Sequence, residues 1–151
     1  MDLGGRRAIL ILPATFMNES GQAVGPLVRY YKVGTENVVL VHDDIDLPFG
    51  KLRFHFGRGT GGHNGVASVV RALSDLDVWR LKFGVGRPPG RMDPADFVLR
   101  HFYDRERADV DLLVPEAAEV LRIFGAEGEE AARQRAGEAA RRLGIGGIEP
   151  E

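Results

Sequence analysis

The chain has 151 residues, of which 44% are hydrophobic and 28% charged, and its formal net charge is −2 at pH 7. This length fits one domain with a buried core. The absence of cysteine excludes disulfides, thiolate metal sites and a cysteine nucleophile, and it fits a cytoplasmic protein. The sequence contains no apolar run of about 18 residues that could cross a membrane, and no signal peptide at its start.

Short apolar runs alternate with helical patterns along the chain. The predicted strands are Ala8–Leu12, Val38–Val41, Lys51–Phe56 and Arg80–Val85. The predicted helices run from Asn18 or Ser20 to Gly34, from His63 to Leu73, from Pro94 to Phe102, from Pro115 to Phe124 and from Glu127 to Leu143. This alternation indicates a single α/β domain over residues 1–143, with a mixed, mainly parallel sheet and flanking helices. Residues 144–151 are expected to form a disordered tail.

Basic residues are concentrated in the middle of the chain. Between Lys51 and Arg91 there are eight basic side chains and only two acidic ones. In the last strand of this stretch, Arg80 and Lys82 are expected on one face. Such a block is the footprint of a nucleic-acid or phosphate partner, but arginines scattered over several solvated faces would look the same. Charge alone favours the second interpretation.

Two segments at the expected carboxyl ends of strands carry polar side chains, and ligands of open α/β sheets bind there. The segment His42–Asp46 follows the second predicted strand. Its spacing matches neither the calcium loop nor the zinc helix motif, and acids at a strand end more often form turns, so we expect no metal site. The segment Gly57–Gly65 is a glycine-rich loop before a helix, which could present N–H groups to an anion, but it lacks the phosphate-loop spacing.

A Ser-His-Asp triad is not indicated. Ser20 and Ser68 lie inside predicted helices, and neither is surrounded by the residues of a nucleophile elbow.

Three motifs in register resemble the bacterial peptidyl-tRNA hydrolase family, over nearly the whole chain from about Leu3 to the last helix. They are Thr15-Phe16-Met17-Asn18-x-Ser20-Gly21, His42-Asp43-x-Ile45-Asp46-Leu47-Pro48-x-Gly50 and Gly61-Gly62-His63-Asn64-Gly65, followed by Gly84-Val85-Gly86-Arg87-Pro88. The resemblance implies an esterase that uses water as nucleophile, without cofactor or metal, to release the peptide from peptidyl-tRNA. It also implies a cytoplasmic protein with no obligate protein partner, monomeric if complete.

The resemblance assigns roles to individual residues. Asn18 and Asn64 would hold the peptide and ester groups and position water, because a neutral amide both donates and accepts hydrogen bonds. Asp43 would orient a general-base histidine. The same cleft would be lined by Phe16, Met17 and His63. Simpler roles remain open, since both asparagines could be helix caps and Asp43 a turn residue.

Three further positions match those that face tRNA in the family. They are Arg53, His55 and Lys82. His55 stands where lysine is frequent, so its contact would be weaker at neutral pH. All three could also be ordinary surface groups.

The chain departs from the family pattern at its start. The family domain begins with a strand carrying an asparagine and a helix carrying the catalytic histidine, and about fifty residues that include both would be absent here. None of the chain's own histidines fits that place; they are His42, His55, His63 and His101. Since the missing strand is central in the family sheet, we expect exposed strand edges and poor behaviour as a monomer. The chain alone should be weakly active or inactive, and the alternative is a non-catalytic RNA-binding protein of the same fold.

Overall fold

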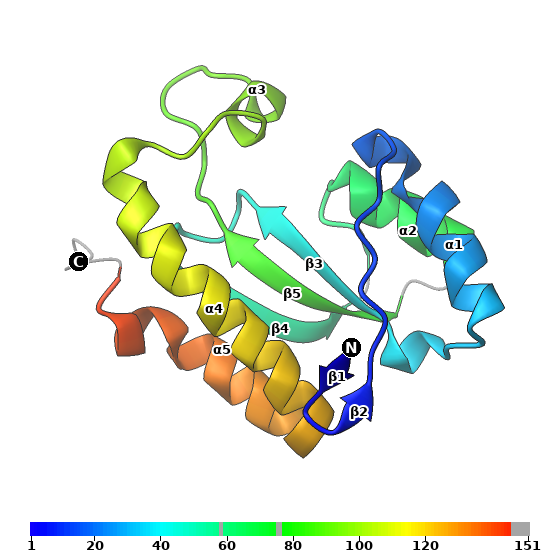
Figure 1. Cartoon of the computed structure of the whole chain (residues 1–151). Helices are drawn as coiled ribbons and strands as arrows, with labels where there is room; N and C mark the ends of the chain where they lie inside the picture. The colour runs from blue at the N-terminus through cyan, green and yellow to red at the C-terminus, as the bar shows by residue number, and fades with distance from the viewer. Residues whose placement is uncertain (58, 75–76, 146–151) are drawn as a thin grey trace. The chain divides into compact units, whose positions relative to one another are not determined.

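The computed structural model describes residues 1–57, 59–74 and 77–145 (Figure 1). The strands are β1 (Asp2–Leu3), β2 (Arg6–Arg7), β3 (Val39–Asp44), β4 (Leu52–Gly57) and β5 (Val78–Gly84). The helices are α1 (Ser20–Tyr30), α2 (Asn64–Leu73), α3 (Pro94–Val98), α4 (Asp104–Glu127) and α5 (Glu129–Leu143). Two 3-10 turns, η1 (Met17–Glu19) and η2 (Thr35–Asn37), precede α1 and β3. The predicted α/β class is confirmed.

The main sheet is mixed, as the sequence predicts, and its strands are ordered β3-β5-β4. β5 runs parallel to β3, because the N–H groups of Trp79 and Val85 donate in turn to the carbonyls of Val38 and Asp44. β4 runs antiparallel to β5, since Gly84 at the end of β5 donates to Lys51 at the start of β4 (Figure 1). A separate hairpin, β1–β2, was not predicted from the sequence.

The predicted strand Ala8–Leu12 does not form, so this prediction is wrong. Leu10 is 69% exposed and Leu12 is 83% exposed. Across residues 8–12, the backbone hydrogen bonds found within the described part of the chain are the two that join Ala8 to Met1. An apolar run becomes a strand only when a neighbour satisfies its backbone groups, and none of the described strands lies beside this segment in the sheet order.

The predicted helix start at Pro115 is also wrong, because α4 begins at Asp104 and continues through Pro115. At this start the N–H of Tyr103 donates to the Glu106 carboxylate at 3.0 Å, which satisfies a group that the helix cannot. Proline usually marks a first turn, but α4 continues for twelve residues beyond Pro115, where Ala117, Val120 and Ile123 are buried. α1 also contains a proline, Pro26.

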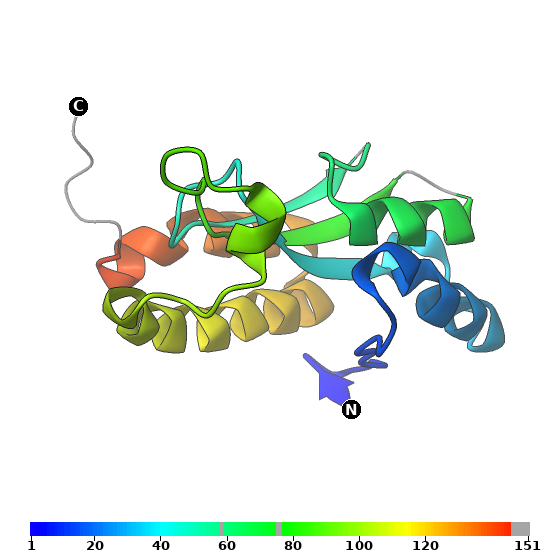
Figure 2. The same ribbon diagram turned by 90° about the horizontal axis from the view of Figure 1, so that it is seen from above.

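Two compact units share the chain, and their boundary in sequence passes through β3, β4 and β5. The first comprises Met1, residues 8–42 and residues 55–80. Here α1 and α2 pack together (Figures 1 and 2). The Gly21 N–H donates to Ser68 Oγ at 2.8 Å, and a Cβ on Gly21 would collide with the Ser68 carbonyl oxygen. Only glycine allows this approach. The same unit contains an apolar core of Val66, Val70 and Val78.

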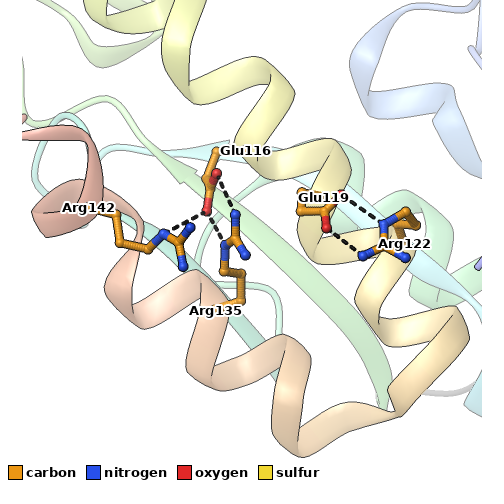
Figure 3. Close-up of polar contacts among 5 residues, drawn as sticks. All are labelled: Glu116, Glu119, Arg122, Arg135 and Arg142. Atoms are coloured by element: carbon orange, nitrogen blue, oxygen red, sulfur yellow. Dashed lines mark hydrogen bonds and ion pairs between the residues drawn. The ribbon is translucent and has the colours of Figure 1, made fainter.

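The second unit comprises residues 2–7, 43–54 and 81–151. In it α4 packs against α5, and the buried carboxylate of Glu116 bonds the guanidinium of Arg135, with Arg142 at 4.0 Å (Figure 3). This bond raises the pKa of the Arg135 guanidinium. Next to it, Glu119 and Arg122 form an exposed pair one turn apart on α4, which lowers the pKa of the Glu119 carboxyl (Figure 3).

The structured chain continues past the predicted end of the domain. Ile145 is buried, and its N–H donates to the carbonyl of Ala140 at the end of α5. The remaining residues of the expected tail, 146–151, lie outside the described residues.

Candidate active site

The first unit brings η1 and the start of α2 together. Gly65, the second residue of α2, is buried and lies very close to Met17. A Cβ added to Gly65 would lie only 2.5 Å from Met17 Sδ. Ser20 Oγ donates to the Met17 carbonyl at 2.7 Å and closes η1. One turn further along, the Gly21–Ser68 hydrogen bond joins α1 to α2. Segments more than forty residues apart in sequence therefore meet at the Met17–Gly65 contact.

Asn18 and Asn64 lie next to this contact, one on each segment, and both side chains are exposed. Neither is a helix cap, which removes the simpler role left open by the sequence. The N-cap of α1 is Glu19, and the N-cap of α2 is His63, whose Nδ1 accepts the Val66 N–H at 3.2 Å. Within the described part of the chain, neither amide makes a hydrogen bond, so both are available to an external ligand.

His42 and His63 stand edge to face, with ring centroids 4.7 Å apart. Since His63 Nδ1 accepts a hydrogen bond, its neutral ring carries the proton on Nε2. Phe16 and Met17 are exposed large side chains on the segment leading into α1. The structure thus groups five of the predicted site residues in one unit; they are Phe16, Met17, Asn18, His63 and Asn64.

Asp43 belongs to the second unit, at the end of β3, where it is partly buried. The neighbouring acids are engaged elsewhere. Asp44 accepts the Asp46 N–H at 2.8 Å and pairs with Lys82 at 3.3 Å, and Asp46 pairs with Arg87. Asp44 and Asp46 therefore shape the turn after β3.

The predicted tRNA contacts differ in their surroundings. Arg53 is exposed on β4, whereas His55 on the same strand is half-buried. The Lys82 side chain is only 17% exposed and pairs with Asp44. Arg80 does not lie on an open face with Lys82: it is 1% exposed, so the basic stretch overstates the positive charge available at the surface. The reason is that β5 is the central strand of the sheet, which the local sequence pattern does not reveal.

The first unit offers neutral amides and imidazoles, and the second offers the Asp43 carboxylate. Among residues 1–57, 59–74 and 77–145, no group of three or more histidine or acidic side chains is placed to hold a metal ion. No described helix is long and apolar enough to span a membrane. Such a donor set suits polar recognition and proton transfer to or from an oxygen or nitrogen atom.

A family model described as peptidyl-tRNA hydrolase matches residues 1–142. The chain belongs to the peptidyl-tRNA hydrolase family. It is 47% identical over 131 residues to a peptidyl-tRNA hydrolase of Mycobacterium tuberculosis, a match that covers 87% of this chain and 69% of the relative. A similar relative from Rhodococcus erythropolis is also 47% identical and covers 88% of this chain and 70% of that protein.

Solved structures of peptidyl-tRNA hydrolases have the same fold as this family member. One from Acinetobacter baumannii superimposes with a TM-score of 0.84 at 27% identity, covering 92% of this chain and 70% of that chain. Another, crystallised in complex with N-propanol, gives a TM-score of 0.78 at 28% identity, and the match spans 65% of its length and 85% of this chain. The chain therefore spans about two thirds of the length of the relatives that it matches.

Two structural features near the candidate site of this peptidyl-tRNA hydrolase family member were not predicted from the sequence. One is the Met17–Gly65 contact, although a glycine directly after Asn64 in a helix start was a signal that a close neighbour was required. The other is the buried Arg80, for which the sequence gives no signal, because a strand's place in the sheet order is a property of the tertiary structure.

Proposed function

We propose that this chain is a hydrolase of peptidyl-tRNA, which cleaves the ester between a peptide and the 3′ end of tRNA and returns the tRNA to translation in the cytoplasm. The observation that carries the proposal is the pair of exposed amides, Asn18 and Asn64, on the two sides of the Met17–Gly65 contact. The family membership and the names of the relatives support the choice of substrate.

The chemistry is an acyl transfer to water. The water oxygen attacks the ester carbonyl carbon, the bond to the ribose oxygen breaks, and the products are a free peptide carboxyl and a ribose hydroxyl. Negative charge develops on the carbonyl oxygen, and preorganised donors stabilise it. The Asn64 amide, at the positive end of α2, can donate to that oxygen, while the Asn18 amide can hold the peptide or the attacking water.

The attacking water must also lose a proton, and the histidines of the chain are poorly suited to accept it. Nδ1 of His63 already accepts the Val66 N–H, His42 stands against His63, His55 is half-buried on β4, and His101 is exposed between α3 and α4. We therefore propose that the general base is a histidine outside these four, that Asp43 orients it, and that the 151-residue chain alone turns over slowly.

Recognition of the tRNA body is assigned to basic residues, with unequal weight. Arg53 is the strongest candidate because its side chain is exposed on β4. Lys82 would contact a phosphate only when its pair with Asp44 opens, and His55 is half-buried, so it offers less surface to a partner than Arg53. Phosphate contacts of this kind position the acceptor end and make binding weaker at high salt.

A second candidate function is RNA binding without catalysis. The unsuitability of the four histidines favours it for this chain, while the two available amides favour hydrolysis. The two functions differ in one observable: both bind peptidyl-tRNA, but only the enzyme releases peptide.

Cleavage of peptidyl-tRNA with a labelled peptide tests the proposal. Two proteins are compared: the 151-residue chain, and the same chain fused behind the part of the Mycobacterium tuberculosis relative that precedes its matched stretch. The chain should bind but cleave slowly. The fusion should cleave about 10²–10⁴-fold faster, the usual contribution of a positioned general base. In the fusion, Asn64→Ala should lower kcat strongly, whereas Asn37→Ala, an exposed asparagine in η2, should leave it unchanged.

Three outcomes would overturn parts of this proposal. A fusion that binds peptidyl-tRNA but releases no peptide would support the RNA-binding alternative. An unmodified chain as fast as the fusion would show that the base lies among its own histidines. Equal kcat for Asn64→Ala and the parent would remove the role of the amide.

A further inference from the structure

Among the residues that the structure describes, Arg80 is the largest fully buried side chain, although arginine is among the residues least often buried. It projects from β5, the central strand, in the unit that also contains the start of α2. Burial lowers the pKa of its guanidinium, an effect that nearby Asp77 partly offsets. A buried charge is costly compared with an apolar side chain of similar volume, and the adjacent core of Val66, Val70 and Val78 is apolar. The cost suggests a specific task for this residue.

The guanidinium reaches the loop between β4 and α2. Arg80 Nη2 donates to the carbonyl oxygen of Gly59. At the end of β4, a Cβ on Gly57 would lie 3.2 Å from Arg80 Nε, so the absence of a side chain there makes room for the arginine to pass. Gly59 has φ +73°, a conformation that glycine adopts at little cost. Both glycines of this loop segment thus fit the arginine contact.

A short series of hydrogen bonds connects this contact to Asn64. Thr60, next to Gly59, accepts the His63 N–H on its carbonyl at 3.0 Å. His63 in turn caps α2 through Nδ1, which accepts the Val66 N–H at 3.2 Å. Asn64 follows His63 and is the first residue of α2. The carbonyl that Arg80 holds is therefore one residue before the turn that fixes the helix cap, and the cap fixes the direction in which the Asn64 side chain leaves the helix.

We propose that Arg80 is a positioning residue, whose guanidinium holds the Gly59 carbonyl and thereby fixes the loop that places Asn64. Its role in catalysis rests on the function proposed above, whereas its role in ordering the loop does not. Arginine suits this task better than lysine, because its planar fork gives directed donors at a fixed geometry. An arginine that only filled space could be replaced by an apolar side chain of similar size without any effect on the loop.

Amide hydrogen exchange on the 151-residue chain tests the ordering role without any requirement for activity. The reporter is the His63 N–H, and the reference amides are those of Val69 in α2 and Leu81 in β5. Arg80→Met should make His63 exchange about tenfold to a hundredfold faster, as expected when a hydrogen bond to a charged group is lost, while the reference amides change little. Arg71→Met, at an exposed position on α2, is the matched control and should change none of them.

Arg80→Lys provides a variant that retains the charge and is expected to fold. It should leave the reference amides protected but restore His63 protection only in part. In the fusion protein described above, both Arg80 variants should lower kcat with little change in KM, since Asn64 would be misplaced and the tRNA contacts unaltered.

The inference and the proposed function fail in different ways. If His63 protection in both Arg80 variants equals that of the parent, or if all amides lose protection together, Arg80 has no specific hold on the loop and the inference is overturned. If the loop loosens as expected but the parent fusion binds peptidyl-tRNA and releases no peptide, the ordering role stands and the proposed function fails.

Discussion

At the residue scale, Asp43 and Asp44 are adjacent in β3 but are given different roles: Asp44 accepts the Asp46 N–H and pairs with Lys82, whereas Asp43 is proposed to orient the general base. Asp43→Asn keeps the size of the side chain and removes its charge. If Asp43 orients the general base, the change should lower kcat roughly a hundredfold or more, because a carboxylate behind a histidine sets its tautomer and stabilises its charged form. KM and the midpoint of thermal unfolding should change little. Steady-state cleavage of peptidyl-tRNA by the fusion protein measures the effect.

Asp44→Asn is the matched control. The asparagine Oδ1 can still accept the Asp46 N–H, but the pair with Lys82 is lost, and both of these side chains are less than one fifth exposed. We expect a small fall in the unfolding midpoint and a kcat close to that of the parent. A larger loss of kcat for Asp44→Asn than for Asp43→Asn would show that the roles of the two acids had been assigned in the wrong order.

At the scale of elements, two helical glycines in the second unit should respond to alanine in opposite directions. Gly125 lies in α4, and a Cβ there would overlap the carbonyl oxygen of Leu3 in the β1–β2 hairpin. Gly137 lies in α5, and a Cβ there would meet nothing within 4 Å. Alanine at either position gains helix propensity of about 1 kcal/mol. At Gly125 this gain competes with displacement of the hairpin backbone, which cannot rotate away as a side chain would.

We therefore expect Gly125→Ala to lower the free energy of unfolding by about 1–3 kcal/mol, the usual cost of forcing extra volume into a packed site. Gly137→Ala should raise it by about 0.5–1 kcal/mol. Urea denaturation measures both. Equal stabilisation by the two substitutions would mean that the hairpin does not pack on α4 in solution.

At the scale of the whole molecule, apolar side chains are exposed along one segment of the first unit. Leu10, Leu12, Phe16 and Met17 are all exposed, and Val41 on the outer strand β3 is 55% exposed. Exposed apolar groups and outer strands of a sheet both favour association. Sedimentation velocity should therefore show the chain self-associating as its concentration rises, and Leu10→Lys should reduce this association.

Leu99→Lys is the control for added charge, because Leu99 is even more exposed than Leu10 but follows α3 in the second unit. It should leave the concentration dependence close to that of the parent. A parent chain that sediments as a monomer at every concentration, or an equal effect of the two lysines, would show that the segment around Leu10 does not mediate association.

The sequence by itself determined what depends on local pattern. The alternation in Lys51–Phe56 and the helical spacing after His63 predicted β4 and α2 to within a residue, and the motifs around Asn18, Asp43 and Asn64 led to the family. Local chemistry decides such features, because side-chain periodicity and capping involve residues close in the chain.

Only the tertiary structure decided which side chains have partners. Ala8–Leu12 has the composition of a strand but no neighbour in the sheet, and Arg80 and Lys82 resemble surface charges until β5 is found at the centre of the sheet. Likewise, only the structure shows that Glu19 and His63, and not Asn18 and Asn64, occupy the N-cap positions. Burial, ion pairing and strand formation depend on groups distant in sequence, whose approach is set by the packing of the whole fold and not by any local pattern.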